Sequence, residues 1–175
     1  MPLEIAPHHP RWAVAFAEEA SALRTAMPGT ILAVHHIGST AIPGIFAKPV
    51  IDILCAVSDL RDVESAAEKL ADLGYLAKGE YGIEGRRYFQ KKDLAGMRTH
   101  HVHMYEIGSH HIERHIALRD YLVAHPYWAK AYSEAKAAIL AGSPLSRQDY
   151  QDGKAPIVAA LEVEAVDWFR RREFR

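Results

Sequence analysis

The chain has 175 residues, of which 49% are hydrophobic and 25% charged, and its formal net charge is −1. This length suits a single domain over residues 1–175, which would bury roughly 70% of its unfolded surface. The near-neutral charge argues against a protein that wraps duplex nucleic acid, and the single cysteine, Cys55, excludes an internal disulfide. The N-terminus does not resemble a signal peptide and no apolar run is long enough to span a membrane, so we expect a cytoplasmic protein with no membrane span.

The first half of the sequence alternates between helical and extended patterns. Apolar residues recur there at spacings of three and four, or stand together in short runs. The predicted elements, in order, are a helix after Pro10 that Pro28-Gly29 ends, strands over residues 31–37 and 50–57, and a helix over residues 60–73 with Ser58 or Asp59 as its cap. Gly38-Ser39 forms a turn between the two strands, and Gly74 ends the second helix.

The second half changes from a β-rich segment to a helical one. Its predicted elements are strands over residues 75–77, 86–90 and 100–107, a helix between Ser109 and His125, a helix over residues 126–140 that ends at Gly142, and a last helix after the capping-box pattern of residues 146–149. Strands mixed with helices, followed by a helical C-terminal third, predict an α/β or α+β fold.

One carboxylate, Asp52, interrupts the otherwise apolar run of residues 50–57. An ionised carboxylate is costly to remove from water unless a cation or several hydrogen-bond donors meet it. We therefore expect Asp52 at a strand end, where it faces a cleft or a metal ion.

A second candidate feature is the polar turn that precedes this strand. Gly38 would let the backbone approach a ligand closely, and the hydroxyls of Ser39 and Thr40 with nearby amides could hold phosphate oxygens. Lys48 lies between this turn and Asp52 and could neutralise a phosphate. The alternative interpretation is a strand-ending turn with capping hydroxyls, in which Lys48 is a solvated loop residue.

The third candidate feature is a pair of histidines on one strand. Because side chains alternate along a strand, His101, His103 and Tyr105 share one face. Such a pair supplies half of a divalent-metal site, with Asp52 as a candidate third ligand. The other candidates for the third ligand are His35, His36, His110, His111 and His115. The alternative interpretation is a set of hydrogen-bonded structural imidazoles.

Arginines next to aromatic residues form the fourth feature. Arg86 and Arg87 precede Tyr88, and such a pattern can grip phosphates and stack a base, so Arg87 is a candidate phosphate ligand. Arg119 allows a second interpretation, in which it pairs with an acid and so fastens the helical third to the sheet.

Taken together, these residues resemble the GrpB family. The resemblance is carried by residues 36–53, which read HIGSTAIPGIFAKPVIDI, and by later matches that include HPRW at 9–12 and HVH at 101–103. It covers about residues 8–170. It implies a nucleotidyltransferase-like fold, which is a small mixed sheet flanked by helices.

The resemblance also implies a site, with one departure from the expected pattern. In nucleotidyltransferases the Gly-Ser turn holds terminal phosphates, and three acids on two strands bind magnesium. Here Asp52 is present, Leu54 replaces the second acid, and His101 and His103 take the place of the third. One acid with two imidazoles suits two magnesium ions poorly and suits a single softer ion such as zinc, manganese or nickel better. The cofactor expected overall is one divalent metal ion, Mg, Mn or Zn.

The resulting hypothesis is a nucleotidyltransferase-like domain that binds a nucleotide or another phosphorylated small molecule, with Asp52 as the catalytic and metal-binding acid. Whether such an incomplete set of acids supports catalysis is left open. Family relatives occur joined to dephospho-CoA kinase, so an alternative is a non-catalytic accessory domain with a protein partner in coenzyme A metabolism. A third hypothesis is a histidine-based metal-dependent hydrolase.

Overall fold

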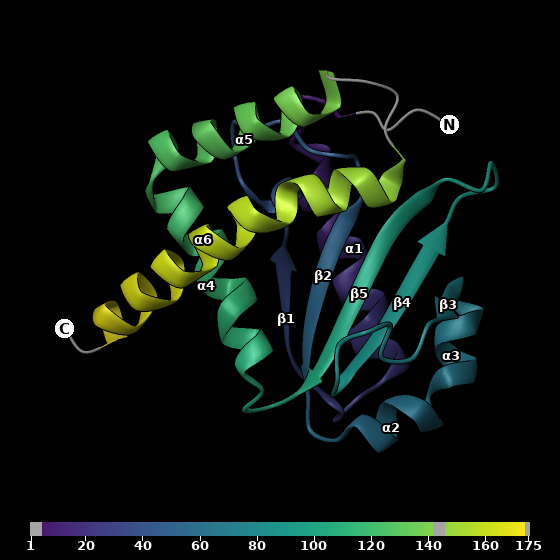
Figure 1. The fold of residues 1–175 in the computed structure, drawn as a ribbon. Helices are drawn as coiled ribbons and strands as arrows, with labels where there is room; N and C mark the ends of the chain where they lie inside the picture. Colours follow the sequence, from purple (N-terminus) through teal and green to yellow (C-terminus); the bar gives the residue numbers. More distant parts are fainter. Residues whose placement is uncertain (1–4, 142–145, 174–175) are drawn as a thin grey trace.

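The computed structural model describes residues 5–141 and 146–173, and Figure 1 shows the fold. The strands are β1 (Ile31–Ile37), β2 (Ile51–Val57), β3 (Tyr75–Ala77), β4 (Arg86–Lys92) and β5 (Arg98–Glu106). The helices are α1 (Arg11–Ala26), α2 (Leu60–Ser65), α3 (Ala67–Asp72), α4 (His110–Ala124), α5 (Pro126–Ala141) and α6 (Arg147–Glu173). The predicted mixed sheet with a helical C-terminal third is therefore confirmed.

The strands form one sheet in the order β1-β2-β5-β4-β3. β2 and β5 are parallel, whereas β1 pairs with β2, β4 with β5, and β3 with β4 in antiparallel fashion. The register of the parallel pair sets Asp52 opposite His101 and Leu54 opposite His103. Since side chains alternate along each strand, these four side chains share one face of the sheet.

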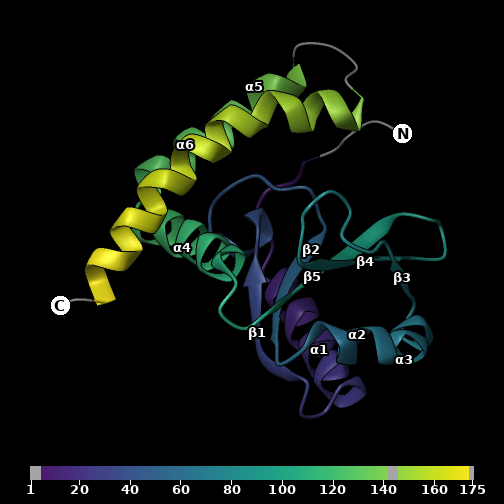
Figure 2. The same ribbon diagram turned by 60° about the horizontal axis from the view of Figure 1, so that its bottom comes forward.

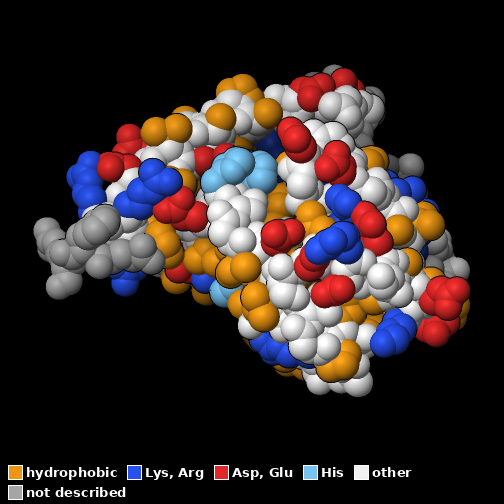
Figure 3. All heavy atoms as spheres, turned by 90° about the horizontal axis from the view of Figure 1, so that it is seen from below, with side chains coloured by type: hydrophobic (Ala, Val, Ile, Leu, Met, Phe, Trp, Pro, Cys, Tyr) orange, Lys and Arg blue, Asp and Glu red, His pale blue; other side chains and the backbone are white. Residues whose placement is uncertain are grey.

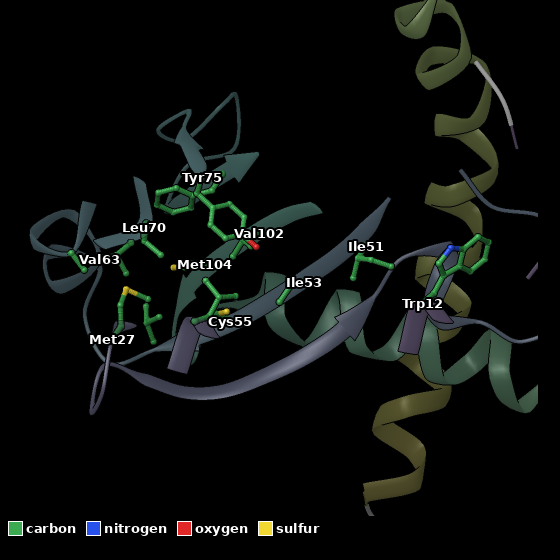
Figure 4. Close-up of a cluster of buried hydrophobic side chains, with 14 of the residues drawn as sticks. Trp12, Met27, Ile51, Ile53, Cys55, Val63, Leu70, Tyr75, Val102 and Met104 are labelled. Carbon is green, nitrogen blue, oxygen red and sulfur yellow. The ribbon is translucent and has the colours of Figure 1, made fainter. Parts of the chain in front are cut away.

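Helices α1, α2 and α3 cover the other face of the sheet (Figures 1 and 2). This face carries the larger apolar core, part of which is shown in Figure 4. Its fully or almost fully buried members include Leu23, Ile53, Cys55, Val63, Leu70, Val102 and Met104. Each large apolar side chain buried in this way contributes about 1.5–3 kcal/mol, so this layer holds the strands in register.

The helical C-terminal third lies on the face that carries Asp52. Ile112 and Ile116 of α4 pack against a small cluster formed by Ile37, Leu54 and Tyr105 of the sheet. Helix α6 runs along α4 and α5, beyond the end of the sheet (Figures 1 and 2). Within the described part of the chain, no helix combines the length and the apolar character needed to cross a membrane.

The segment between β1 and β2 joins the sheet to these helices. Ile42 and Ile45 are 3% and 2% exposed and belong to the apolar cluster of α4, α5 and α6. The backbone amide of Phe46 donates to the Ser133 hydroxyl of α5 at 2.8 Å. The turn after β1 is therefore held directly beneath α5.

Element boundaries agree with the sequence except in a few places. The helix predicted over residues 60–73 is divided at Ala66, and Val63, Ala66 and Leu70 on both sides of the break pack into the same core. Asp59, not Ser58, caps it by accepting from the Arg61 amide at 2.7 Å. The predicted helix end at Gly142 lies outside the described residues.

The predicted capping box is confirmed at the start of α6. The Asp149 amide donates to the Ser146 hydroxyl at 3.1 Å, and the Ser146 amide donates to the Asp149 carboxylate at 2.9 Å. This reciprocal pair satisfies two backbone donors that a helix start leaves free.

Candidate functional site

A cavity of about 540 Å³ opens between the sheet and the helical third. The turn after β1 and the first residues of β2 form its floor, and residues of β4, β5, α4, α5 and α6 form its walls. This volume lies in the range of small-molecule sites in proteins. Of the predicted site residues, Gly38, Ser39, Thr40, Lys48, Asp52, His101 and His103 line the cavity.

Gly38 is positioned by a backbone conformation that suits glycine. Its φ is +70° and its ψ is −174°, a combination that residues with a side chain rarely adopt. A Cβ atom at this position would lie 2.6 Å from Oδ2 of Asp52. The glycine therefore allows the turn to lie directly against the Asp52 carboxylate, and the 3-10 turn Ser39–Ala41 follows it.

Asp52 lies beside two histidines of β5 and shares a hydrogen bond with one of them, His101. His101 Nδ1 lies 3.0 Å from Asp52 Oδ1, and His103 Nε2 lies 3.8 Å from the same oxygen. Burial by itself would raise the pKa of the Asp52 carboxyl, but the hydrogen bond from His101 and the nearby ring of His103 outweigh it and hold this pKa below its usual range. Asp52 is therefore ionised at neutral pH, and the predicted orientation of this acid toward a cleft is confirmed.

The contacts with Asp52 and Arg86 indicate which ring nitrogen of each histidine carries a proton. An ionised carboxylate only accepts, so His101 donates from Nδ1. A guanidinium only donates, and Arg86 Nη1 lies 3.5 Å from His103 Nδ1, so the proton of His103 is on Nε2 and faces Asp52. Burial lowers the pKa of His103, which agrees with a neutral imidazole.

This donor set is a poor match for the predicted metal ion. The Asp52 oxygen and the Nδ1 atom of His101 are bonded to each other, so a bound ion would have to replace that hydrogen bond. Among the described residues, no group of three or more His, Cys, Asp or Glu is arranged to hold a metal ion. The metal role of Asp52, His101 and His103 stays a prediction.

Leu54 occupies the position at which the resemblance implies a second acid. It is 0% exposed and lies in the cluster that α4 covers with Ile112 and Ile116. A carboxylate there would be removed from water among apolar side chains, at a cost of several kcal/mol. The packing of α4 therefore explains why an apolar residue stands at this position.

Ser39 and Thr40 have different surroundings. Thr40 is 2% exposed, and its hydroxyl donates to the Val50 carbonyl at 3.3 Å and lies 2.9 Å from Nε2 of His36. These contacts fix the turn to β1 and β2. Ser39 is partly exposed, and its hydroxyl accepts a hydrogen bond from Lys136 at 2.8 Å. Ser39 is thus the hydroxyl better placed to contact a ligand.

Lys136 of α5 is a site residue that the sequence did not reveal. Its ammonium also donates to the Phe46 carbonyl at 2.7 Å and lies 4.4 Å from the centre of the Tyr132 ring. The side chain is 2% exposed and borders the cavity, and no carboxylate pairs with it among the described residues. Burial, aided by the charge of Lys154, lowers its pKa to about 7.

Two neighbouring arginines of β4, Arg86 and Arg87, lie on opposite faces of the sheet. Arg87 points to the other face of the sheet, where it pairs with Glu64 of α2 at 2.5 Å, so it does not line the cavity. Arg86 immediately precedes Arg87 on the strand, so its side chain points to the opposite face, and it lines the cavity. Arg119 donates to the His36 carbonyl at 3.1 Å, which supports its interpretation as a link between the helical third and the sheet.

The other histidines divide between the cavity and the rest of the surface. His115 borders the cavity, with its ring 5.6 Å from that of His103. The remaining candidate ligands do not line it; these are His35, His36, His110 and His111. Figure 3, viewed from below, shows histidine side chains gathered on a face away from α5.

The cavity is strongly cationic although the chain as a whole carries a formal net charge of −1. Its lining contains six basic side chains and two acidic ones. The basic residues are Lys48, Arg86, Arg98, Arg119, Lys136 and Lys154, and the acidic residues are Asp52 and Glu162. Glu162 accepts two hydrogen bonds from Arg114, each of 3.0 Å, and Arg119 donates to Asp120 at 2.7 Å, so one acid and one base of the lining are each paired with a residue outside it. Basic side chains still outnumber acidic ones in the rest of the lining.

Comparison with known proteins finds a family whose model matches most of this chain and a solved structure with a similar fold. The family model described as "GrpB protein" matches residues 2–164. The crystal structure of conserved protein GrpB from Enterococcus faecalis is similar, with a TM-score of 0.90 and 35% identity over 95% of this chain and 99% of that chain.

Two curated relatives differ from this chain in length. The UPF0157 protein YqkA of Bacillus subtilis is 45% identical over 97% of this chain, but the chain spans only 49% of that relative. A dephospho-CoA kinase of Mycolicibacterium paratuberculosis is 36% identical over 77 residues, which cover 42% of this chain and 19% of that protein.

Proposed function

The chain belongs to the GrpB family, and from this premise we propose that it binds a nucleotide or another phosphorylated small molecule in the cavity beside the Gly38-Ser39 turn. The excess of basic over acidic side chains in the cavity lining is the observation that carries the proposal. A cavity walled by cations concentrates anions, and phosphate groups are the common anions of small metabolites.

The residues around the turn would divide the work of holding the phosphates. Lys136 is buried and fixed by Ser39 and Phe46, so it presents its charge without losing side-chain freedom on binding. Lys48 and Lys154 also border the cavity, and they would bring further charge to the same ligand. The Gly38-Ser39 turn allows the ligand to approach the backbone closely.

Asp52 would face the reacting end of such a ligand. Its carboxylate is ionised and held by His101, so it could accept a hydrogen bond from a hydroxyl group of the ligand or acceptor. With Leu54 at the second position, the site lacks the paired acids of two-metal transfer. Binding is therefore the core of the proposal, and nucleotidyl transfer is the reaction class to which the resemblance points.

A second candidate is the accessory role in coenzyme A metabolism. It is favoured by the partial match to the dephospho-CoA kinase, which covers 77 residues. In that case dephospho-CoA, or the kinase itself, would be the partner of this chain.

Calorimetry would test both candidates. Wild type and Asp52→Ala are titrated with nucleoside mono-, di- and triphosphates and with dephospho-CoA, each with EDTA and with Mg²⁺, Mn²⁺ or Zn²⁺. We expect wild type to bind one of these ligands in EDTA, because Lys136 and its neighbours supply the charge. If a divalent metal strengthens binding to wild type and Asp52→Ala loses that gain, the metal prediction is supported. If nothing on the panel binds, the proposed function is wrong.

A further inference from the structure

The loop between β3 and β4 has an unusual backbone at the edge of the cavity. Tyr81 adopts a φ of +46°, whereas the other described residues with positive φ are glycines. Bulky residues rarely adopt this left-handed conformation, because the Cβ atom crowds the backbone. Glycine neighbours at 79, 82 and 85 also have positive φ, so the loop makes several sharp turns to place this one tyrosine.

Hydrogen bonds fix the loop in this shape. Arg86 donates from Nη2 to the Tyr81 carbonyl at 2.7 Å and from Nε to the Glu80 carbonyl at 3.0 Å. The Gly85 amide donates to the Glu80 carboxylate at 2.7 Å, and the Tyr88 amide donates to the Gly79 carbonyl at 2.9 Å. Strain that is over-determined by its surroundings in this way is a feature of binding sites.

One side of the Tyr81 ring is supported and the residue remains open to a ligand. The ring stacks on Tyr88 with centroids 5.2 Å apart and an angle of 23° between planes. Tyr88 in turn lies beneath the Arg86 guanidinium, 4.8 Å from its ring centre. Tyr81 is nevertheless 59% exposed, and it borders the same cavity as Asp52 and Lys136.

The sheet sets the spacing between the strand that supports this ring and the strand that carries Asp52. β4, which carries Tyr88, lies two strands from β2, which carries Asp52. Adjacent strands are about 4.8 Å apart, so the two are separated by about 10 Å. Such a span suits a molecule with phosphates at one end and a planar ring at the other.

We propose that Tyr81 is a stacking platform for a planar heterocyclic ring, so that the ligand of this cavity is a nucleotide and not a phosphorylated sugar or acid. This inference rests on the proposed function and names the class of its ligand. The fixed loop holds Tyr81 ready for stacking, and the basic side chains around Ser39 take the phosphates. Arg98, which also lines the cavity, adds charge near the β4 side.

Paired ligands with and without a base test the proposal. Wild type, Tyr81→Ala and Tyr81→Phe are titrated with AMP against ribose 5-phosphate and with ATP against tripolyphosphate, and the other common bases follow. Stacking a base on an aromatic side chain is typically worth about 1–3 kcal/mol. We therefore expect Tyr81→Ala to weaken nucleotide binding about fivefold or more, to leave the base-free ligands unchanged, and Tyr81→Phe to bind as wild type does.

A matched control is Tyr127→Ala on α5, which removes a tyrosine that is 75% exposed and outside the cavity lining. It should change neither class of ligand. If Tyr81→Ala weakens both classes equally, or neither, the platform is refuted while phosphate binding by wild type still supports the proposed function. If wild type binds neither class, both the platform and the proposed function are wrong. Melting temperatures of each variant separate lost folding from lost stacking.

Discussion

Replacing Lys136 with methionine is expected to weaken the binding of phosphorylated ligands about 30-fold or more while the protein stays folded. Truncating one partner of a buried, charge-assisted contact typically costs about 2–5 kcal/mol of binding. Lys136 is 2% exposed, bonded to Ser39 and Phe46, and turned into the cavity. Methionine keeps most of the volume and removes the charge.

Folding stability separates this effect from general damage. Removing a buried cation that no carboxylate of the described residues pairs with removes its desolvation cost, which stabilises the fold. The Phe46 carbonyl loses its hydrogen-bond donor Lys136, which destabilises the fold. The two changes oppose each other, so the free energy of unfolding in urea should change by less than about 2 kcal/mol. Lys130→Met is the matched control, because Lys130 lies on the same helix, is 77% exposed and pairs with Glu134. Equal affinities for the two variants would contradict the role of Lys136.

The same lysine predicts a pH dependence of binding. Burial, with the nearby charge of Lys154, lowers the pKa of Lys136 to about 7, so the free protein loses this charge as the pH rises above neutrality. A phosphate monoester is already a dianion there, since its second pKa is about 6. Affinity should therefore fall between pH 7 and pH 9 in wild type. In Lys136→Met this decline should be absent.

The lowered pKa of Lys136 also predicts how the stability of the fold changes with pH. In the unfolded chain the pKa of a lysine is about 10.4, above the value of about 7 in the fold. Between these values the unfolded state binds more protons, so this group makes the protein more stable as the pH rises through that window. Wild type should therefore gain stability relative to Lys136→Met from pH 7 to pH 10.

Replacing Gly38 with alanine is expected to lower the free energy of unfolding by about 3 kcal/mol and to disturb the Asp52 carboxylate. The backbone at Gly38 has a φ of +70°, and the new Cβ would lie 2.6 Å from Asp52 Oδ2. The carboxylate would have to move, and its 3.0 Å hydrogen bond to His101 would lengthen. Chemical denaturation measures the first effect, and the NMR signals of the His101 ring report the second.

Gly44→Ala is the control for this prediction. Gly44 has a similar φ of +78°, but a Cβ there would meet nothing within 4 Å. It should lose about 1–2 kcal/mol from the backbone conformation alone and keep the environment of His101. If Gly38→Ala and Gly44→Ala behave alike in both measurements, the close approach of the turn to Asp52 has no energetic weight.

Local sequence patterns predicted much of the fold. Helix α1 and strands β1, β2 and β3 lie within one residue of their predicted limits, because their apolar spacing and their Gly and Pro ends are local signals. Alternation along β5 correctly placed His101 and His103 on one face. The order of the strands was not predicted, since pairing depends on contacts between distant segments.

The site was only partly predictable, for the same physical reason. Asp52 was visible as a lone acid in an apolar strand, whereas Lys136 is an ordinary lysine in a helical pattern. It reaches Ser39 across 97 positions of sequence, and only the packing of α5 over the turn makes it buried. The sequence did not show whether Arg86 or Arg87 faces the cavity, because the face on which each lies depends on how β4 pairs with β5.

Recognition of phosphate groups by the basic lining of this cavity is best tested with pairs of ligands that differ only in phosphorylation. Adenosine, AMP, ADP and ATP, with the corresponding series for the other bases, are titrated into wild type by calorimetry at two salt concentrations. We expect a phosphorylated member to bind at least about tenfold more tightly than its nucleoside, and the difference to shrink at high salt. Equal binding of nucleoside and nucleotide, or binding of neither, would contradict it.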